Sequence, residues 1–444
     1  MKHLGTKLKI KFAVMSIFTL LWLCLSMWIS YYWYLGLTDY MPKFLAILIV
    51  GSLACLPAFN SASLFGGVVL DKQRNYKNIP DWLPDVTIMI AAYNEEKGIY
   101  HTLEHLARQK YPGNMLIKVI DNNSKDNTKN EIMRAVKDFS MLHIEYLFEE
   151  TPGKFAALNN GLATTTSPYV ITLDADTTVY GNIGVATLVN HIYQQEKKGR
   201  KIGGVAGGVF VHNPKDSFMT RLQEWEYFLA INNIKRAQGI WSSTLVCQGA
   251  FSVYNTELLK EIGGWKDSIG EDIVLTWDIM EKDCMPQFEP EAITFTDVPT
   301  TYKAFFKQRS RWYRGLIEAL RQRPFWEYPK LMHKLFVLQD YILPIVDFGL
   351  ACFFIPGILL AIFFQNYLIV GPLVLLMLPW TLLVISAFFY KEYKYVFKQQ
   401  EKPLKVYPNV LGFIFYTLFF NLMVAPAACW GYLQEIFQVR RQWK

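Results

Sequence analysis

The chain has 444 residues, of which 52% are hydrophobic and 19% charged, and its formal net charge is +7. A mean hydropathy of +0.14 is high for a soluble enzyme, and the apolar residues are concentrated towards the two ends of the chain. Away from those ends, no basic stripe is interleaved with aromatic side chains, which argues against a nucleic-acid partner.

Two long apolar runs begin the chain, at residues 12 to 34 and about 44 to 70. Each is long enough for the ~20 residues of a membrane-spanning helix. The first ends in an aromatic belt and lacks a small-residue cleavage site, which predicts an anchor rather than a cleaved signal peptide. Basic residues precede the first run and follow the second: Lys2, His3, Lys7, Lys9, Lys11, Lys72, Arg74 and Lys77. This charge pattern predicts a helical hairpin with both ends in the cytoplasm.

The middle of the chain alternates apolar runs with helical patterns. Strands are predicted at 86–92, 117–121, 144–147 and 169–174, with helices between them. Alternation of this length favours an α/β domain with a mostly parallel sheet. Later elements are a glycine-dense strand at 203–209, an amphipathic helix at 218–237 and a helix from 273. A Gly-x-Gly-x-x-Gly motif between a strand and a helix is absent, so the sequence lacks a dinucleotide-binding fingerprint.

Acidic residues occur where strands are predicted to end or helices to begin. Asp174 and Asp176 directly follow the last of the four strands, and ligands of open α/β sheets bind at such strand ends. Two carboxylates one residue apart suit a hard divalent cation that also holds phosphate oxygens. Asp-x-Asp is also common in turns, and Glu271 and Asp272 could serve only to stabilise a helix N-terminus.

The last third of the chain is again apolar. Residues 302 to 325 mix basic and aromatic side chains, which is typical of a helix in the membrane interface. Apolar runs follow around 346 to 364, 367 to 390 and 408 to 432, with a basic loop at 391 to 405. Five spans would leave the basic C-terminus outside, against the charge rule. Three explanations stay open: Pro426 breaks the last helix, residues 334 to 347 dip into the bilayer, or the rule fails here.

Five motifs follow one another between residues 86 and 315. They are Asp121 after the second strand, Gly153-Lys154 with Ala157-Leu158-Asn159, Asp174-Ala175-Asp176, Gly270-Glu271-Asp272, and Gln308-Arg309-Ser310-Arg311-Trp312. With the flanking apolar helices, they resemble the processive, membrane-embedded family 2 glycosyltransferases, the group of cellulose, chitin, hyaluronan and poly-N-acetylglucosamine synthases. The resemblance implies a Rossmann-like α/β domain of the GT-A type, located in the cytosol and inserted between α-helical transmembrane segments.

The resemblance also implies four regions and a role for each motif. The regions are a transmembrane hairpin (1–72), the GT-A domain (73–300), interfacial amphipathic helices (301–345) and about three transmembrane helices (346–444). Asp272, with Glu271 beside it, is expected to act as the catalytic base. Asp174 and Asp176 are expected to hold Mg²⁺ or Mn²⁺. The expected donor-binding residues are Ala92, Tyr93, Asn94, Glu95, Asp121, Lys154, Asp174, Ala175, Asp176, Gln308, Arg311 and Trp312. The expected acceptor-binding residues are Gln248, Gly249, Trp312 and Asp272.

Three positions depart from the usual family motifs. Asp121-Asn122-Asn123-Ser124 stands where Asp-Asp-Gly-Ser is common, and Gly270 stands where Thr usually precedes Glu-Asp. Tyr313-Arg314-Gly315 also differs from the form expected after the tryptophan motif. The first change removes one carboxylate. Asparagine keeps the capacity for hydrogen bonding, and it tolerates turn conformations.

The function that the resemblance implies is an inverting, processive synthase that extends a β-linked polysaccharide from a UDP-sugar and exports it. The layout is most similar to poly-β-1,6-N-acetylglucosamine synthases, so GlcNAc is the expected sugar. The expected partners are the UDP-sugar, the growing polysaccharide and the bilayer of the plasma or inner membrane, with room for a small accessory membrane subunit. Hyaluronan, cellulose and chitin synthesis remain open, as does single-sugar transfer to a membrane lipid. A transporter or scaffold without catalysis would not need Asp174, Asp176 and Asp272 together.

Overall fold

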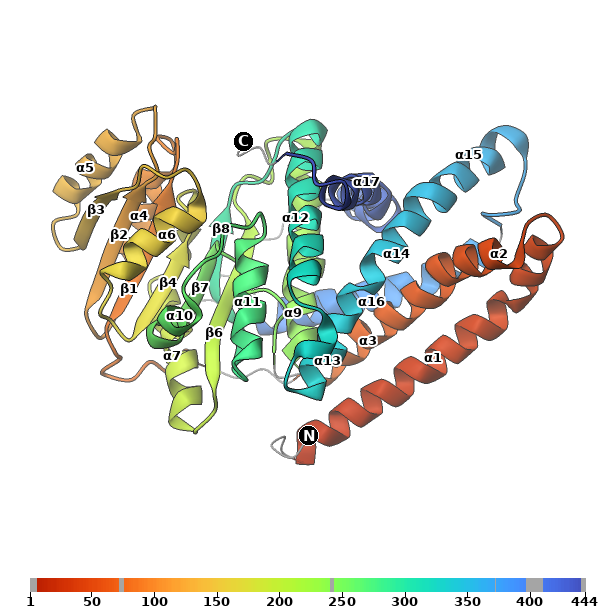
Figure 1. Ribbon diagram of the computed structural model, residues 1–444, viewed down its shortest axis with the longest axis horizontal. Helices are drawn as coiled ribbons and strands as arrows, with labels where there is room; N and C mark the ends of the chain where they lie inside the picture. The colour runs from red at the N-terminus through yellow and green to blue at the C-terminus, as the bar shows by residue number, and fades with distance from the viewer. Residues whose placement is uncertain (1–5, 72–75, 240–242, 372, 397–409, 441–444) are drawn as a thin grey trace.

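The computed structural model describes residues 6–71, 76–239, 243–371, 373–396 and 410–440. Several basic residues that entered the orientation argument lie outside these ranges: Lys2, His3, Lys72, Arg74, residues 397–405, Arg441 and Lys444. In Figure 1 a sheet domain occupies one half of the molecule and long apolar helices the other, with α12 at the boundary.

Eight strands form one sheet in the described residues, in the order β3-β2-β1-β4-β7-β6-β8-β5. The strands are β1 (Val86–Ala92), β2 (Met115–Asp121), β3 (His143–Phe148), β4 (Tyr169–Leu173), β5 (Thr177–Val179), β6 (Ile202–Val211), β7 (Phe251–Asn255) and β8 (Met285–Thr296). The first four pair in parallel, as predicted. β7 is antiparallel to both β4 and β6, and β5 is antiparallel to β8, so the complete sheet is mixed. The prediction missed β8 because two prolines, two glutamates and a glutamine interrupt its apolar pattern.

Helices cover both faces of the sheet. The covering helices are α4 (Ile99–Ala107), α5 (Thr128–Asp138), α6 (Lys154–Ala163), α7 (Gly184–Lys197), α10 (Thr256–Ile262) and α11 (Glu271–Glu281). Leu103 of α4, Ile132 of α5 and Leu188 of α7 belong to one apolar core. Apolar side chains of α6, α10 and α11 form a second core on the other face, where Leu158 and Leu275 are buried. Two apolar layers thus hold the strand ends in fixed positions.

Two helical segments lie between the sheet and the apolar helices. The predicted helix at 218–237 is α8 (Phe218–Glu226) and α9 (Asn232–Gln238), joined by a π-helical turn at Tyr227–Ile231. The predicted interfacial helix is α12 (Tyr302–Gln322), followed by a 3-10 turn at Phe325–Glu327. α12 has strongly separated polar and apolar faces, and its buried face includes Phe305 and Leu316. It packs along the last helix of the chain.

The apolar helices are numerous and several contain π-helical turns. They are α1 (Thr6–Thr38), α2 (Lys43–Val50) with α3 (Leu56–Leu70), α13 (Leu331–Asp340), α14 (Ile342–Gly349), α15 (Ile355–Phe364), α16 (Leu373–Tyr395) and α17 (Val410–Ile436). Four stretches of the described residues are long and apolar enough to cross a membrane: Lys9–Thr38, Lys43–Leu70, His333–Phe364 and Leu411–Ile436. Pro426 lies inside α17, so the explanation in which it ends the last helix is wrong.

Candidate active site

The sheet topology brings the acidic motifs to one edge. Because β1, β2 and β4 are parallel, their C-terminal ends lie together, and these ends carry Asn94, Asp121 and Asp174. β7 is antiparallel to β4 with Leu173 opposite Phe251, so the loop that precedes β7 reaches the same edge. The expected donor and acceptor residues therefore gather around the carboxyl ends of the strands.

The Asp-x-Asp pair lies at the centre of this edge. Lys154 Nζ is 2.5 Å from Asp174 Oδ1. Thr177 and Thr296 hydroxyls lie 3.3 and 3.4 Å from Asp176 Oδ1. Burial raises the pKa of Asp176 to about 6, and the neighbouring Asp174 carboxylate contributes in the same direction. Ala175, between the two, has its side chain in the core.

Lys154 connects the Asp-x-Asp pair with the Glu-Asp pair. Its Nζ is also 3.6 Å from Glu271 Oε1. Gly249 lies against the same ammonium, since a Cβ there would be 2.5 Å from Nζ. Burial lowers the pKa of Lys154, but Asp174 and Glu271 outweigh it and the net pKa is above the ordinary lysine value. The ammonium therefore stays charged and sits where a diphosphate would need it.

Glu271 and Asp272 begin α11. Asp272 Oδ1 accepts a hydrogen bond from the Ile273 amide at 2.8 Å, which orients its carboxylate at the helix N-terminus. Burial raises the pKa of Glu271 to about 7, with Lys154 acting against it. Gly270 packs against Gly315 of α12, where a Cβ on Gly270 would be 3.0 Å from the Gly315 Cα. A threonine at position 270 would not fit this helix contact, which explains the departure from the usual triplet.

The expected nucleoside pocket lies at the ends of β1 and β2. Asn94 adopts a left-handed φ of 56°, and its side-chain oxygen accepts from the Lys125 amide at 2.8 Å. Glu95 donates its amide to Thr128, and Tyr93 remains 42% exposed. Ala92 is buried at the strand end. These contacts clamp the β1 loop onto the β2 loop.

Asp121 is buried and already holds two donors. Its Oδ1 accepts from the Ser124 amide at 2.9 Å and its Oδ2 from the Tyr146 hydroxyl at 3.0 Å. Burial and the Asp121 carboxylate raise the pKa of Tyr146 to about 12. The sequence analysis did not identify Tyr146, although its place near the end of the predicted strand at 144–147 put it opposite the end of β2. A base that binds Asp121 would share this carboxylate with Tyr146.

Asn122 is a second residue that the motif comparison undervalued. Its amide group donates to the Glu149 and Thr151 carbonyls at 3.2 and 2.6 Å, and its Oδ1 accepts from the Gly153 amide at 2.8 Å. A carboxylate cannot donate, so aspartate would lose the first two bonds. Gly153 has φ +134°, where L side chains are strained. Asn122 thus fixes the turn that presents Lys154.

Two glutamine side chains have an oxygen ready for a ligand. Gln248 donates to the Gly207 carbonyl, while its Oε1 is buried without a hydrogen-bond partner among the described residues. Gln308 Oε1 is in the same situation on α12. Buried unsatisfied oxygens are costly in a folded protein.

The backbone that carries Gln248 is held from α11. Thr276 accepts the Cys247 amide at 2.8 Å, and the indole N–H of Trp277 donates to the Leu245 carbonyl at 3.2 Å. Trp277 is almost fully buried. The helix that begins with Asp272 therefore also positions the loop of Gln248.

The tryptophan motif lies on α12, and its Arg311 is near the Glu-Asp pair. Arg311 is exposed and close enough to Glu271 to lower its pKa, against the larger effect of burial. Trp312 is 40% exposed, and the guanidinium of Arg309 lies 4.0 Å from its ring centroid.

The residues at the edge fit a divalent cation held together with a diphosphate. Asp174 and Asp176 supply two hard oxygen donors. Among the described residues, no cluster of three or more His, Cys, Asp or Glu side chains is arranged to hold a metal ion by itself. Phosphate oxygens and water would therefore complete the coordination, as Mg²⁺ commonly requires. Lys154 would have to share Asp174 with the cation.

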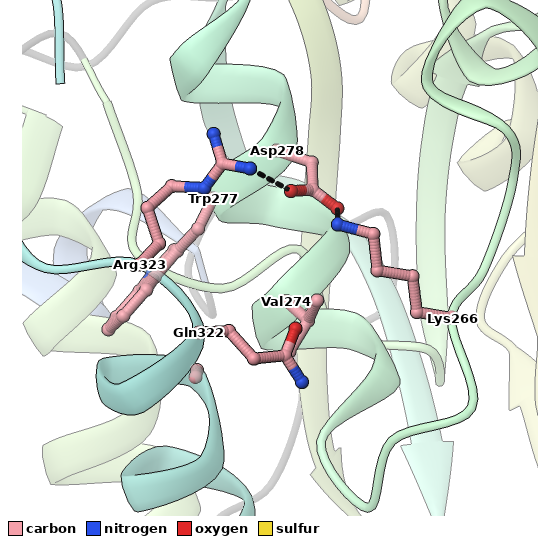
Figure 2. A pocket seen from close by; sticks show the side chains of 7 residues that line it. Lys266, Val274, Trp277, Asp278, Gln322 and Arg323 are labelled. Atoms are coloured by element: carbon pink, nitrogen blue, oxygen red, sulfur yellow. Dashed lines mark ion pairs between the residues drawn. The ribbon is translucent and has the colours of Figure 1, made fainter. Parts of the chain in front are cut away.

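A cavity of about 50 Å³ lies farther along α11 and α12. Figure 2 shows Asp278 between Lys266 and Arg323, whose nitrogens are 2.7 and 3.2 Å from its carboxylate oxygens. The other residues that line it are Val274, Trp277, Ala319 and Gln322. None of them belongs to the predicted site. The cluster joins the distant parts of the two helices that carry Asp272 and Trp312.

Comparison with known proteins identifies the family. Residues 84–315, just over half of the chain, match the family described as glycosyltransferase like family 2. A poly-beta-1,6-N-acetyl-D-glucosamine synthase of Staphylococcus epidermidis is 30% identical over 289 residues, covering 65% of this chain and 66% of the relative. A synthase of the same name from Staphylococcus aureus (strain COL) is 31% identical over 241 residues, covering 54% and 56%. The matched region thus spans 66% and 56% of the two relatives' lengths, less than two thirds in both cases.

A solved structure supports the fold. A mannosyltransferase from Pyrobaculum calidifontis, in complex with GDP-Man and Mn²⁺, has a TM-score of 0.52 at 18% identity and covers 87% of this chain and 99% of its own. The sheet domain therefore has the GT-A-like fold that the motifs predicted, flanked by apolar helices.

Proposed function

The chain belongs to glycosyltransferase family 2, and we propose that it is an inverting, processive polysaccharide synthase that uses UDP-GlcNAc. It would add each sugar to the non-reducing end of a β-linked chain on the cytoplasmic face and pass that chain through its membrane helices. The printed names of the relatives favour a poly-β-1,6-linked GlcNAc product. Hyaluronan, cellulose or chitin synthesis is the alternative within the same class.

One observation carries the proposal: a single lysine joins the expected diphosphate site to the expected base. Lys154 Nζ lies within ion-pair distance of both Asp174 and Glu271, and Asp272 follows Glu271. A donor held at Lys154 would therefore present its sugar beside Asp272. Proximity of this kind is what transfer between two bound substrates requires.

In the proposed reaction, Asp272 accepts the proton of the acceptor hydroxyl while that oxygen attacks the anomeric carbon. The bond between this carbon and the diphosphate oxygen breaks, and UDP leaves with the electron pair. Attack from the opposite face inverts the configuration. Lys154 and Arg311 are expected to stabilise the charge that develops on the diphosphate.

Asp174 and Asp176 would hold Mg²⁺ or Mn²⁺, which when bound supplies Lewis-acid stabilisation of the leaving diphosphate. Gln248 and Gln308 would bind sugar hydroxyl groups through their unsatisfied oxygens. Trp312 would stack on the acceptor ring and Asp121 would hydrogen-bond the base. Exposed Tyr93 would lie beside the nucleoside.

The connection of α12 to the apolar helices supports export. Phe305 contacts Phe420 with ring centroids 5.7 Å apart, and Tyr313 contacts Tyr432 at 5.5 Å. Both partners lie in α17, a candidate span. The helix of Trp312 thus packs directly against a helix of the membrane region, where an extending chain would leave the site. A small accessory membrane subunit is compatible with this arrangement.

The test is incorporation of labelled sugar by purified membranes. UDP-GlcNAc, UDP-glucose, and UDP-GlcNAc with UDP-glucuronate are supplied with Mg²⁺ or Mn²⁺, and products are sized beside an Asp272→Asn control. A long polymer from UDP-GlcNAc alone that is absent from the control supports the proposal, and linkage analysis then separates a β-1,6 product from chitin. If the only product is a single labelled lipid, the enzyme transfers one sugar at a time and the processive proposal is wrong.

A further inference from the structure

Arg309 lies at an unassigned position of the tryptophan motif, and the proposed reaction gives it no role. Its side chain is buried, although it is a fully charged group. One guanidinium nitrogen, Nη2, lies 2.6 Å from Glu226 Oε2. The guanidinium carbon is also 4.0 Å from the ring centroid of Trp312 and 5.0 Å from that of Phe305.

Arg309 covers one part of the Trp312 indole and leaves another part exposed. A guanidinium within about 6 Å of an aromatic face is attracted by the ring quadrupole. The indole is nevertheless 40% exposed, so Arg309 covers only part of it. Because the arginine is buried, its side chain has little freedom to move away. The indole is therefore fixed from one side and accessible from another.

Glu226 gives this support a connection to the sheet domain. It is the last residue of α8, which follows β6 in the chain, whereas Arg309 lies 83 positions later in α12. Burial raises the pKa of Glu226 to about 7, and Arg309 acts in the opposite direction. The ionised carboxylate thus depends on the guanidinium, and each residue holds the other in place.

The pair is not fully satisfied as a structural contact. Arg309 Nε is buried without a hydrogen-bond partner among the described residues. Arg236 Nη2 is likewise buried without a partner among the described residues, so the unpaired donor alone does not set this pair apart. What sets Arg309 apart is the Trp312 ring, whose centroid lies 4.0 Å from the guanidinium carbon.

A second buried pair on α12 provides the contrast. Arg314 Nε is 3.0 Å from Glu435 Oε2, and its Nη2 donates to the Val439 carbonyl. Both residues of this pair are as buried as those of the first. Among the described residues, the Arg314 guanidinium has no cation–π contact with Trp312, unlike that of Arg309. It links α12 to α17 and so serves as a matched structural control.

We propose that Glu226 and Arg309 are positioning residues for the acceptor. Glu226 holds the Arg309 guanidinium against Trp312, and the guanidinium fixes the indole in the orientation that stacks on the terminal sugar ring. This inference rests on the proposed function, because it assumes that Trp312 contacts the acceptor. It assigns a role to two residues that make no contact with the sugar themselves.

The first test separates acceptor from donor kinetics in the full chain, reconstituted in lipid nanodiscs. Oligosaccharides of defined length serve as acceptors, and the donor is the UDP-sugar that the wild type uses best. We expect Glu226→Gln and Arg309→Met to raise the acceptor KM about tenfold and to change the donor KM less than twofold. Arg309→Lys should recover part of the loss, since it keeps the charge but not the planar group.

Coupling and the control pair make the test specific. In a Trp312→Phe background, Arg309→Met should raise the acceptor KM by much less than in the wild type, since residues that act through one another are not additive. Arg314→Lys and Glu435→Gln should leave the acceptor KM within twofold. Additive effects, or an equal rise in the control variants, would overturn the proposal and leave a purely structural pair.

A spectroscopic measurement decides the matter without turnover. The protein is labelled with 5-fluorotryptophan, and the ¹⁹F line of Trp312 is identified as the one lost in Trp312→Phe. Glu226→Gln and Arg309→Met should shift or broaden this line, whereas Arg314→Lys should not. An unchanged line in the first two variants refutes the inference. If the wild type transfers no sugar, the proposed function fails, and the fluorine line still decides whether the pair fixes Trp312.

Discussion

The strand edge and the boundary with the apolar helices both contain buried charge, but they balance it differently. At the strand edge, the carboxylates of Asp174, Asp176, Glu271 and Asp272 lie near the Lys154 ammonium, and the Arg311 guanidinium lies near Glu271. At the boundary, each buried arginine of the described residues lies beside a buried carboxylate: Arg236 with Glu392, Arg309 with Glu226, and Arg314 with Glu435. The first region has more carboxylates than basic groups, whereas in the second every buried arginine is paired.

The difference indicates what each set of charges is for. Carboxylates held close together without enough cations oppose folding, and proteins retain them where a ligand supplies the missing charge. Paired charges at a domain boundary mainly fix how two parts of the fold meet. We therefore expect strand-edge variants to lose catalysis or ligand binding and to keep their stability, whereas variants of the Arg236–Glu392 pair should lose stability. Variants of Arg309 and Glu226 should also raise the acceptor KM, because this pair supports Trp312 as well.

The largest effect is expected for Asp272→Asn. An amide cannot take the acceptor proton, so the rate of transfer should fall by about 10³-fold or more. Its melting temperature should stay close to that of the wild type, because the amide oxygen can still accept from the Ile273 amide. Radiolabel transfer and thermal unfolding of the same preparation provide both numbers. If the variant is inactive because it is unfolded, the result would not support the proposed difference between the strand edge and the boundary.

The next effect is on stability and concerns Arg236→Met. Arg236 Nε is 2.9 Å from Glu392 Oε2, and Nη1 is 3.6 Å from Asp71, at the end of α3. Removing the arginine leaves the fully buried Glu392 unpaired, which typically costs about 3–5 kcal/mol of unfolding free energy. Denaturant unfolding should show this loss, and Arg236→Met with Glu392→Leu should recover most of it. A single variant as stable as the wild type would contradict the account.

Lys154→Met should affect the donor more than the fold. Losing a charged contact to the diphosphate should raise the donor KM about 10- to 100-fold, corresponding to about 1.5–3 kcal/mol. The acceptor KM should change less. Asn122→Asp should have a smaller effect of the same kind, because it weakens the turn that presents the lysine. Initial-rate measurements with each substrate varied separately would distinguish this from a general loss of activity.

The smallest effect is a dependence of stability on pH. Burial and Asp174 raise the pKa of Asp176 to about 6 in the folded protein, above the ~3.9 of an unfolded aspartate. The folded state therefore binds the Asp176 proton more tightly than the unfolded state does. This difference stabilises the folded protein at low pH, and the stabilisation is lost as the pH rises from about 4 to 6. In metal-free protein, Asp176→Asn should remove this dependence, which for a rise of about two pKa units amounts to at most about 3 kcal/mol. An identical pH profile for wild type and variant would show that Asp176 is not destabilised by its neighbours.

The sequence was a good guide to the strand edge and a poor one to the boundary. Asp174 and Asp176 could be placed because an uninterrupted apolar run predicts the strand that precedes them, and topology then sets their position. Arg236 and Glu392 are 156 positions apart, and neither belongs to a periodic pattern that would indicate its partner. The hydrogen bonds of Asn122 were missed for a related reason. A motif comparison registers the missing carboxylate but not the two carbonyls that need a donor.

The most direct test compares the two regions through ligand binding. The melting temperature of the full chain is measured with and without UDP and Mn²⁺, for the wild type, Arg236→Met and the double variant Asp174→Asn with Asp176→Asn. A ligand that binds only the folded state raises this temperature. The account predicts a similar rise in the wild type and in the less stable Arg236→Met, and almost none in the double variant. A full rise in the double variant would show that the charges at the strand edge are not there for the ligand, which would contradict the central claim.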